Sequence, residues 1–246
     1  MSGSNRLRKT HTEFGGGKVI NNENAKKHEN KVRDSMLEAL ECLRILFPNA
    51  KIILKNTISL IDIMNVTSKR MDRKCSSFWP ESGTIKPDGG IMYFVVNDMR
   101  LPILISEAKK QGTNDVRLLE GKSRQSVGNA CERTYKNTNL IEKMLPENIK
   151  IMPYILFFSG CDFTEEVALR KIGALTLFDE PNKVYVNDET DVNGEPHKKF
   201  SVFLSVEGFT KEYMTNILLY AAIKAIIYFS EKYNFDLKYL TETSKQ

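Results

Sequence analysis

The chain has 246 residues, of which 41% are hydrophobic and 27% charged, enough for one globular domain with a well-buried core. Its net charge of +5 permits an anionic partner without requiring one. The four cysteines form no Cys-x-x-Cys pair, and no apolar run follows the polar N-terminus, which argues against a zinc site and a secretory signal. The most apolar stretch, residues 214–229, is too short to span a membrane. We therefore expect a cytoplasmic protein.

The first third of the chain predicts an arm, two helices and a short strand. Residues 1–20 are basic and glycine-rich and read as a flexible arm, either a disordered tail or a segment that orders on DNA. Residues 21–246 read as a single domain. Apolar residues at helical spacing predict a helix over 24–47, which Pro48 ends. Residues 51–54 predict a strand or a link, and Thr57 is positioned to cap a second helix that continues to Val66.

The centre of the chain predicts a β-hairpin. Residues 91–96 and 101–108 are apolar, and Asn97 and Asp98 between them are typical turn residues. The second strand is apolar on both faces, which is typical of a central strand covered on both sides.

Helices and strands alternate in the remainder. We expect a helix over 125–144, a buried strand over 152–158, a short helix over 164–172, and strands over 184–186 and 200–206. A last, largely apolar helix over 210–233 is buried either in the core or against a second subunit. The interleaved order predicts an α/β fold, with a mixed central β-sheet flanked by helices.

One group of three charged residues in this predicted fold is a candidate catalytic site. Asp88 precedes the first strand of the hairpin, and Glu107 and Lys109 end the second, where they share one face of the strand. An antiparallel hairpin places the start of its first strand beside the end of its second, so Asp88 is expected near the other two. Two adjacent carboxylates are suited to Mg²⁺, which can activate a water for phosphodiester hydrolysis. The bare pattern is also compatible with a salt bridge at a strand end.

Several motifs around this constellation resemble the EcoRI-type restriction endonucleases, a family within the PD-(D/E)xK nuclease superfamily. They are Ile-Lys-Pro-Asp-Gly-Gly-Ile at 85–91, Glu-Ala-Lys at 107–109 with Gln-Gly at 111–112, Leu-Leu-x-Gly-Lys at 118–122, and Gly-Asn-Ala-x-Glu-Arg at 128–133. The last motif is also similar to one in MunI, a relative that shares the AATT centre. The resemblance covers roughly residues 82–160.

The resemblance implies a Mg²⁺-dependent type II restriction endonuclease of the bacterial cytoplasm. Such an enzyme cleaves double-stranded DNA as a homodimer, at a palindrome centred on AATT, leaves 5′ overhangs, and is paired with a cognate DNA methyltransferase. Asp88 and Glu107 would hold Mg²⁺ together with the main-chain carbonyl of Ala108. Lys109 would be the catalytic lysine.

The family also implies that the helix carrying Asn129, Ala130 and Arg133 enters the major groove. Asn129 and Arg133 would contact the adenines, and Glu132 would hold the arginines in place across the dimer. Asparagine pairs bidentately with adenine and arginine donates to purine acceptors, which suits these roles. The implied phosphate contacts are Lys86, Lys136 and Asn137.

Two departures from the family concern specificity and charge. The segment between Lys122 and Gly128 is shorter than in EcoRI, and in the family this segment reads the base pair outside AATT. Arg124 and Gln125 are the side chains here that could make that contact, so the outer bases can differ from GAATTC, be degenerate or go unread. Lys110 stands where EcoRI has a histidine, which makes the site more cationic.

Two rival functions are a non-catalytic, sequence-specific DNA-binding module and a repair or structure-specific nuclease of the same superfamily. The intact Asp88, Glu107 and Lys109 argue against the first. The Gly-Asn-Ala-x-Glu-Arg helix argues against the second. Cleavage at one fixed sequence would exclude both.

Overall fold

The computed structural model describes residues 18–70, 83–96, 99–111, 119, 121, 128–142, 145, 149–187, 189–190, 192–194 and 198–242. For residues 18–26, 66–67, 69–70 and 128–129 it describes the backbone without the side chains. Most of the expected N-terminal arm lies outside this set, as do Arg124 and Gln125. The last three residues of that arm, 18–20, already belong to the first helix, which therefore starts earlier than the expected residue 24.

A five-stranded mixed sheet forms the centre of the molecule, as the sequence predicts. Its strand order is β1 (Lys51–Lys55), β4 (Gly90–Val96), β5 (Met99–Lys110), β6 (Tyr154–Ser159) and β7 (Ser201–Ser205). The pairs β1–β4 and β4–β5 are antiparallel, whereas β5–β6 and β6–β7 are parallel. The long strand β5 therefore joins the two halves of the sheet. The mixed sheet and its flanking helices make this an α/β fold.

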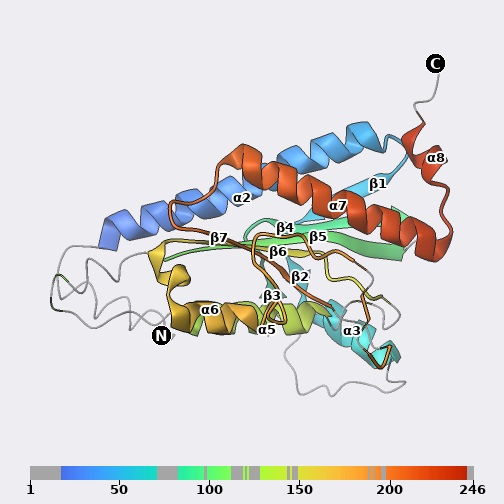
Figure 1. The fold of residues 1–246 in the computed structure, drawn as a ribbon. Coiled ribbons are helices and arrows are strands. Elements are labelled where there is room, and N and C mark those ends of the chain that lie inside the picture. Colours follow the sequence, from blue (N-terminus) through green and yellow to red (C-terminus); the bar gives the residue numbers. More distant parts are fainter. Residues whose placement is uncertain are drawn as a thin grey trace.

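The sheet is buried because helices cover both of its faces (Figure 1). On one face lie α2 (Lys18–Leu46) and α7 (Lys211–Tyr233), which pack on each other and on β5. On the other face lie α3 (Leu60–Arg70), α5 (Gly128–Glu142) and α6 (Glu166–Gly173). All six residues of β6 are buried, as are residues 101–108 of β5, which agrees with the prediction of central strands.

Helix α7 is the most apolar helix in the described part of the chain. Thr210 caps it by accepting a hydrogen bond from the N–H of Tyr213, and Asn234 ends it in the left-handed conformation. The helix extends beyond the apolar stretch 214–229, so, contrary to the expectation from the sequence, it is long and apolar enough to cross a membrane by length and composition. Half of its most apolar part is buried inside the fold. Its buried side chains, Met214, Leu218, Ala221, Ala225 and Phe229 among them, show that it contributes to the core.

Two local predictions are wrong. Thr57 does not cap a helix, because Ile58 and Ser59 form strand β2, which pairs with β3 (Thr84–Ile85), and α3 starts only at Leu60. The hydroxyl of Ser59 accepts from the N–H of Ile61 instead. Residues 184–186 form no strand, because the N–H of Tyr185 donates to the side-chain oxygen of Ser201 and not to a backbone carbonyl.

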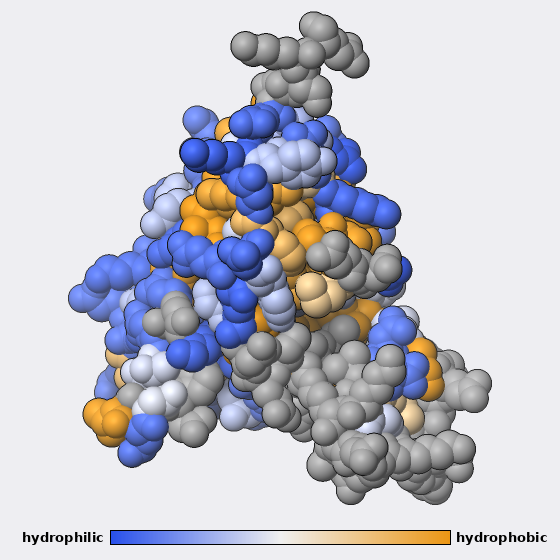
Figure 2. Space-filling model, turned by 90° about the vertical axis from the view of Figure 1, so that its right-hand side faces the viewer, coloured by the Kyte–Doolittle hydropathy of each residue, from blue (hydrophilic) through white to orange (hydrophobic). Residues whose placement is uncertain are grey.

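The chain continues beyond α7 into a short helix, α8 (Leu237–Thr241), at one end of the molecule (Figure 1). The side chain of Asn49 donates to the carbonyls of Tyr239 and Glu242, which ties this end to the turn after α2. Figure 2 views the molecule from this end and shows apolar residues gathered in the middle, between hydrophilic ones.

Candidate active site

The β4–β5 hairpin brings Asp88, Glu107 and Lys109 together. In its register Gly90 lies opposite Ser106 and Ile91 opposite Ile105, so the residues before β4 lie beside the end of β5. The amine of Lys109 is 3.0 Å from Asp88 Oδ2 and 2.7 Å from Glu107 Oε1. The main-chain N–H of Ala108 donates to the same Asp88 oxygen over 3.0 Å. Residues separated by about twenty positions in the sequence thus form one compact polar cluster.

The two glycines after Asp88 allow this approach. The N–H of Gly89 donates to the carbonyl of Ser106, and a Cβ at Gly89 would lie 2.9 Å from side-chain atoms of both Val32 and Met36 of α2. Gly90 has φ +83°, a left-handed conformation that costs other residues free energy. The bend that delivers Asp88 to the end of β5 therefore depends on both glycines.

Glu107 is nearly inaccessible to solvent, with its side chain 4% exposed, so its charge needs partners. Oxygen Oε1 faces Lys109, and Oε2 accepts a hydrogen bond of 2.6 Å from the hydroxyl of Tyr154. Tyr154 is the first residue of β6 and lies opposite Ile105, two positions before Glu107 on the neighbouring strand. Both carboxylate oxygens are therefore held in place.

The charges of the cluster change the pKa values of the groups around it. Burial lowers the pKa of Lys109, but the carboxylates of Glu107 and Asp88 outweigh it and leave that pKa above its ordinary value, so the amine stays protonated. Burial and the nearby Glu107 raise the pKa of Tyr154 well above its ordinary value, so its hydroxyl remains a donor. Burial and the charge of Asp88 raise the pKa of Glu29, on α2, which places a third carboxyl group in the field of the site.

The donor set suits a hard divalent cation. Asp88 and Glu107 each direct an oxygen at one cationic atom, the Lys109 amine, so two carboxylate oxygens converge on a single point. Within the described residues, no three His, Cys, Asp or Glu side chains group as metal ligands. Mg²⁺ commonly takes one or two carboxylates and fills its shell with water, so it does not need a third. In an extended strand the N–H and C=O of one residue point to the same side. The carbonyl of Ala108 therefore points, like its N–H, to the Asp88 side of β5.

The expected DNA-contacting residues that the structure describes lie just after β3 and on α5. Lys86 is exposed and follows β3, two residues before Asp88. On α5, Glu132, Arg133 and Lys136 are exposed, and Ala130 and Asn137 are half-buried. The backbone of Asn129 is helical, and its side chain lies outside the described set, as do Arg124 and Gln125. The opposite face of α5 is buried through Cys131, Thr134, Thr138 and Ile141.

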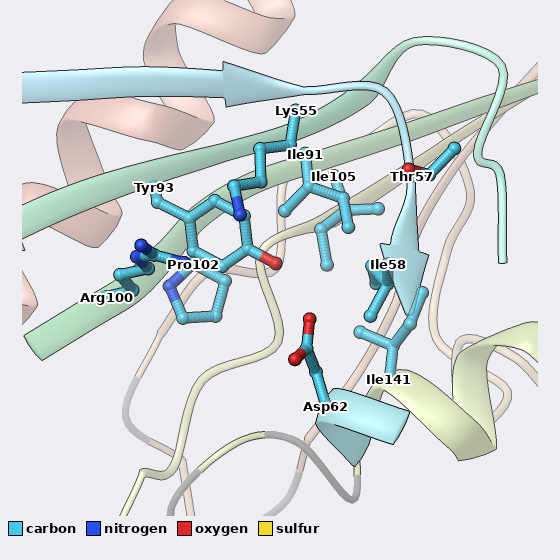
Figure 3. Close-up of a pocket in the computed structure, with 10 residues that line it drawn as sticks. All are labelled: Lys55, Thr57, Ile58, Asp62, Ile91, Tyr93, Arg100, Pro102, Ile105 and Ile141. Carbon is cyan, nitrogen blue, oxygen red and sulfur yellow. The ribbon is translucent and has the colours of Figure 1, made fainter. Parts of the chain in front are cut away.

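A separate cavity of about 190 Å³ is lined by Ile105 of β5 (Figure 3). Side chains two residues apart on a strand share a face, so Glu107 lies on the same face of the sheet as this cavity. Ile91, Tyr93 and Ile105 line it, and Asp62 of α3 points its carboxylate into it. Burial and the charge of Asp62 raise the pKa of Tyr93 to about 12. None of the predicted catalytic residues lines this cavity, so it is distinct from the candidate active site.

The sequence reading missed Tyr154 as part of the site. A signal was available, because a tyrosine in a fully apolar strand needs a partner for its hydroxyl. Glu29 on α2 was also missed, as was the neighbouring His28, which lies 3.3 Å from the hydroxyl of Ser159 at the end of β6. Their distance from the motifs along the chain gave no indication that α2 passes beside the end of β5.

The α/β fold and the Asp–Glu-x-Lys cluster at the end of a central strand define the restriction-endonuclease-like fold class. The family model described as restriction endonuclease EcoRI matches residues 14–187. The match covers well over half of the chain, which therefore belongs to the EcoRI restriction endonuclease family. The type II restriction enzyme RsrI of Cereibacter sphaeroides is 35% identical over 176 residues, covering 63% of this chain and 59% of that enzyme.

Proposed function

We propose that the protein is a Mg²⁺-dependent type II restriction endonuclease, which cleaves double-stranded DNA at a palindrome centred on AATT and leaves 5′ overhangs. The observation that carries the proposal is the convergence of Asp88 and Glu107 on one cationic position, in a chain of the EcoRI family. The similarity to RsrI, named a type II restriction enzyme, supports the reaction type.

In the proposed reaction Asp88, Glu107 and the carbonyl of Ala108 hold Mg²⁺. The bound cation would make a water more nucleophilic and neutralise charge that develops on the phosphate. Lys109 is protonated and only 25% exposed, so its amine is placed to stabilise the negative charge of the phosphate in the transition state. Its hydrogen bonds to both carboxylates orient the amine before DNA arrives.

Helix α5 is the proposed reader of the central base pairs. Asn129 and Arg133 would contact the adenines, and Glu132 would hold the arginines across a homodimer. The exposure of Glu132 and Arg133 on one side of the helix, opposite its buried face, supports this assignment. Ala130 follows Asn129 in the same first turn and packs partly against the core, so only its remaining surface would contact the bases.

The phosphate and outer-base contacts complete the proposed interface. Lys86, Lys136 and Asn137 would bind backbone phosphates, and the exposure of both lysines supports this role. Arg124 and Gln125 would read the base pair outside AATT. We also propose a cytoplasmic enzyme that works beside a cognate DNA methyltransferase, because a nuclease that cuts an AATT-centred palindrome would otherwise cut the DNA of its host.

The direct test is to incubate the protein with plasmid DNA and Mg²⁺ and to sequence the cut ends. We expect one fixed palindrome centred on AATT, with 5′ overhangs. Random ends, or no cleavage with Mg²⁺, would contradict the proposal. Cleavage at DNA junctions or lesions without a fixed sequence would indicate a repair nuclease instead.

A matched pair of variants tests the site. Glu107→Gln removes the charge of a proposed cation ligand and should abolish cleavage while DNA binding persists. Glu41→Gln makes the same change at an exposed residue of α2 that pairs with Arg44, and should cut like the unmodified protein. Equal activity of the two variants would remove Glu107 from the mechanism.

A further inference from the structure

Tyr154 donates a hydrogen bond to Glu107 but is part of neither the sequence motifs nor the set of proposed catalytic residues. The hydrogen bond of 2.6 Å is short, as expected when a hydroxyl donates to a carboxylate. Tyr154 is 0% exposed, so it does not reach a substrate at the surface. Within the described part of the chain, its hydroxyl contacts one side-chain atom, an oxygen of the buried Glu107 carboxylate. Its role therefore has to be exerted through Glu107.

The fold fixes where the Tyr154 hydroxyl lies. In the parallel β5–β6 ladder Tyr154 pairs with Ile105, so its side chain points to the face of the sheet that also carries Glu107. Two strand residues span about 6.6 Å, a distance that the long tyrosine side chain bridges. The ring packs edge-on against Phe200, with ring centroids 5.8 Å apart, which limits its rotation. The hydroxyl is thus held by packing before any cation binds.

This hydrogen bond restricts the rotation of the Glu107 carboxylate. With Oε2 taken by the tyrosine, Oε1 is the oxygen that faces Lys109 and, through it, Asp88. Without the hydroxyl, a buried carboxylate oxygen would lack its donor, and the carboxylate would rotate to find another one. Oxygen Oε1 would then leave the point at which the two carboxylates converge.

We propose that Tyr154 is a positioning residue for the divalent cation site: it orients Glu107 so that Oε1 faces the cation. The proposal rests on the proposed function in one respect, that Asp88 and Glu107 bind a divalent cation. Partners that orient metal ligands typically change metal affinity by about 10- to 100-fold when they are removed. Tyr154→Phe keeps the ring and removes only the hydroxyl, so a loss of affinity in that range is expected.

The test measures Mn²⁺ affinity by electron paramagnetic resonance, in the full-length protein bound to a duplex containing GAATTC. Tyr228→Phe is the matched control, because its hydroxyl also makes a part-buried hydrogen bond, to the N–H of Lys150, away from the site. We expect Tyr154→Phe to weaken Mn²⁺ binding by about 10- to 100-fold and Tyr228→Phe to leave it unchanged. Metal-free DNA binding should be equal in both variants. Equal Mn²⁺ affinities of the two variants would overturn the proposal and leave Tyr154 a packing residue.

A second measurement keeps the hydroxyl of Tyr154 in place. A 3-fluorotyrosine placed at position 154 should shift its ¹⁹F resonance as Mg²⁺ saturates the site, and a resonance that stays constant would overturn the proposal.

The failure of this proposal can be told apart from the failure of the proposed function. A protein that binds Mn²⁺ but cuts no DNA refutes the nuclease and still tests Tyr154. A protein that binds no Mn²⁺ refutes both.

Discussion

His28 makes the folded protein sensitive to mild acid. Its side chain is 5% exposed, lies 3.3 Å from the hydroxyl of Ser159, and is surrounded by lysines of two elements. Burial is the largest cause that lowers its pKa, followed by the positive charges of Lys110 and Lys31 and, less strongly, Lys109. The result is a pKa of about 4, against 6.5 for an ordinary histidine. The folded protein therefore keeps this imidazole neutral at a pH where the unfolded chain would protonate it.

The sign and the magnitude follow from linkage. Between pH 6.5 and pH 4 the unfolded chain binds more protons at His28 than the folded one, so stability falls as the pH falls through this window. A difference of 2.5 between the two pKa values corresponds to about 3 kcal/mol once the window is crossed, and to about 2 kcal/mol at pH 5. Well above pH 6.5, His28 is neutral in both the folded and the unfolded chain, so its effect on the free energy of unfolding no longer changes with pH.

The assay is urea unfolding at pH 7 and pH 5 of the unmodified protein and of His28→Gln, which can still reach the Ser159 hydroxyl. The unmodified protein should lose about 2 kcal/mol more than the variant between the two pH values. The chain has three histidines, so the ring of His28 can also be followed directly by NMR. An equal loss in both proteins, or a His28 ring that titrates near 6.5, would refute the reasoning.

Three further outcomes follow from other contacts. Gly90→Ala should lower stability by more than the roughly 1 kcal/mol expected of Gly194→Ala in thermal unfolding, because both have positive φ but only the Gly90 Cβ would meet backbone, at 2.7 Å. Equal losses would contradict this. Lys109→Met should cost about 2 to 4 kcal/mol without divalent cations, because it leaves the two carboxylates unpaired, and Mg²⁺ should restore part of that loss. A variant that Mg²⁺ stabilises no more than the unmodified protein would argue against a cation at this point. Lys199→Met should cost only about 1 kcal/mol, because its two carboxylate partners are about 40% exposed. It should speed amide hydrogen exchange in residues 179–187 but not in α7.

The predictions that succeeded depended on long apolar patterns. The strands that became β4, β5 and β6 were predicted within a few residues, because continuous burial on both faces leaves a distinctive run of apolar residues. The hairpin register then brought Asp88 to Glu107. The errors occurred where single side chains compete with the backbone. Ser201 replaced a carbonyl as partner of Tyr185, and Ile58 joined a two-residue strand, and neither choice leaves a periodic signal.

Contacts between elements that are distant along the chain could not be predicted from the sequence, for a different reason. The parallel pairing of β5 with β6 sets Tyr154 beside Glu107, and the crossing of α2 over β5 sets Glu29 near the cluster. Both depend on tertiary packing, which spacing along one segment does not encode. The motifs identified the residues that bear charge, and the fold identified those that hold them in place.

The net charge of the cluster formed by Asp88, Glu107 and Lys109 affects the order in which a cation and a DNA phosphate can bind there. Two carboxylates and one ammonium leave the cluster with a net charge of −1, so on its own it repels a phosphate. One divalent cation would reverse that to +1. Without the ion, the cluster would therefore repel the phosphate to be cleaved, even when contacts elsewhere on the protein hold the DNA. The ion would then be needed to place that phosphate as well as to hydrolyse it.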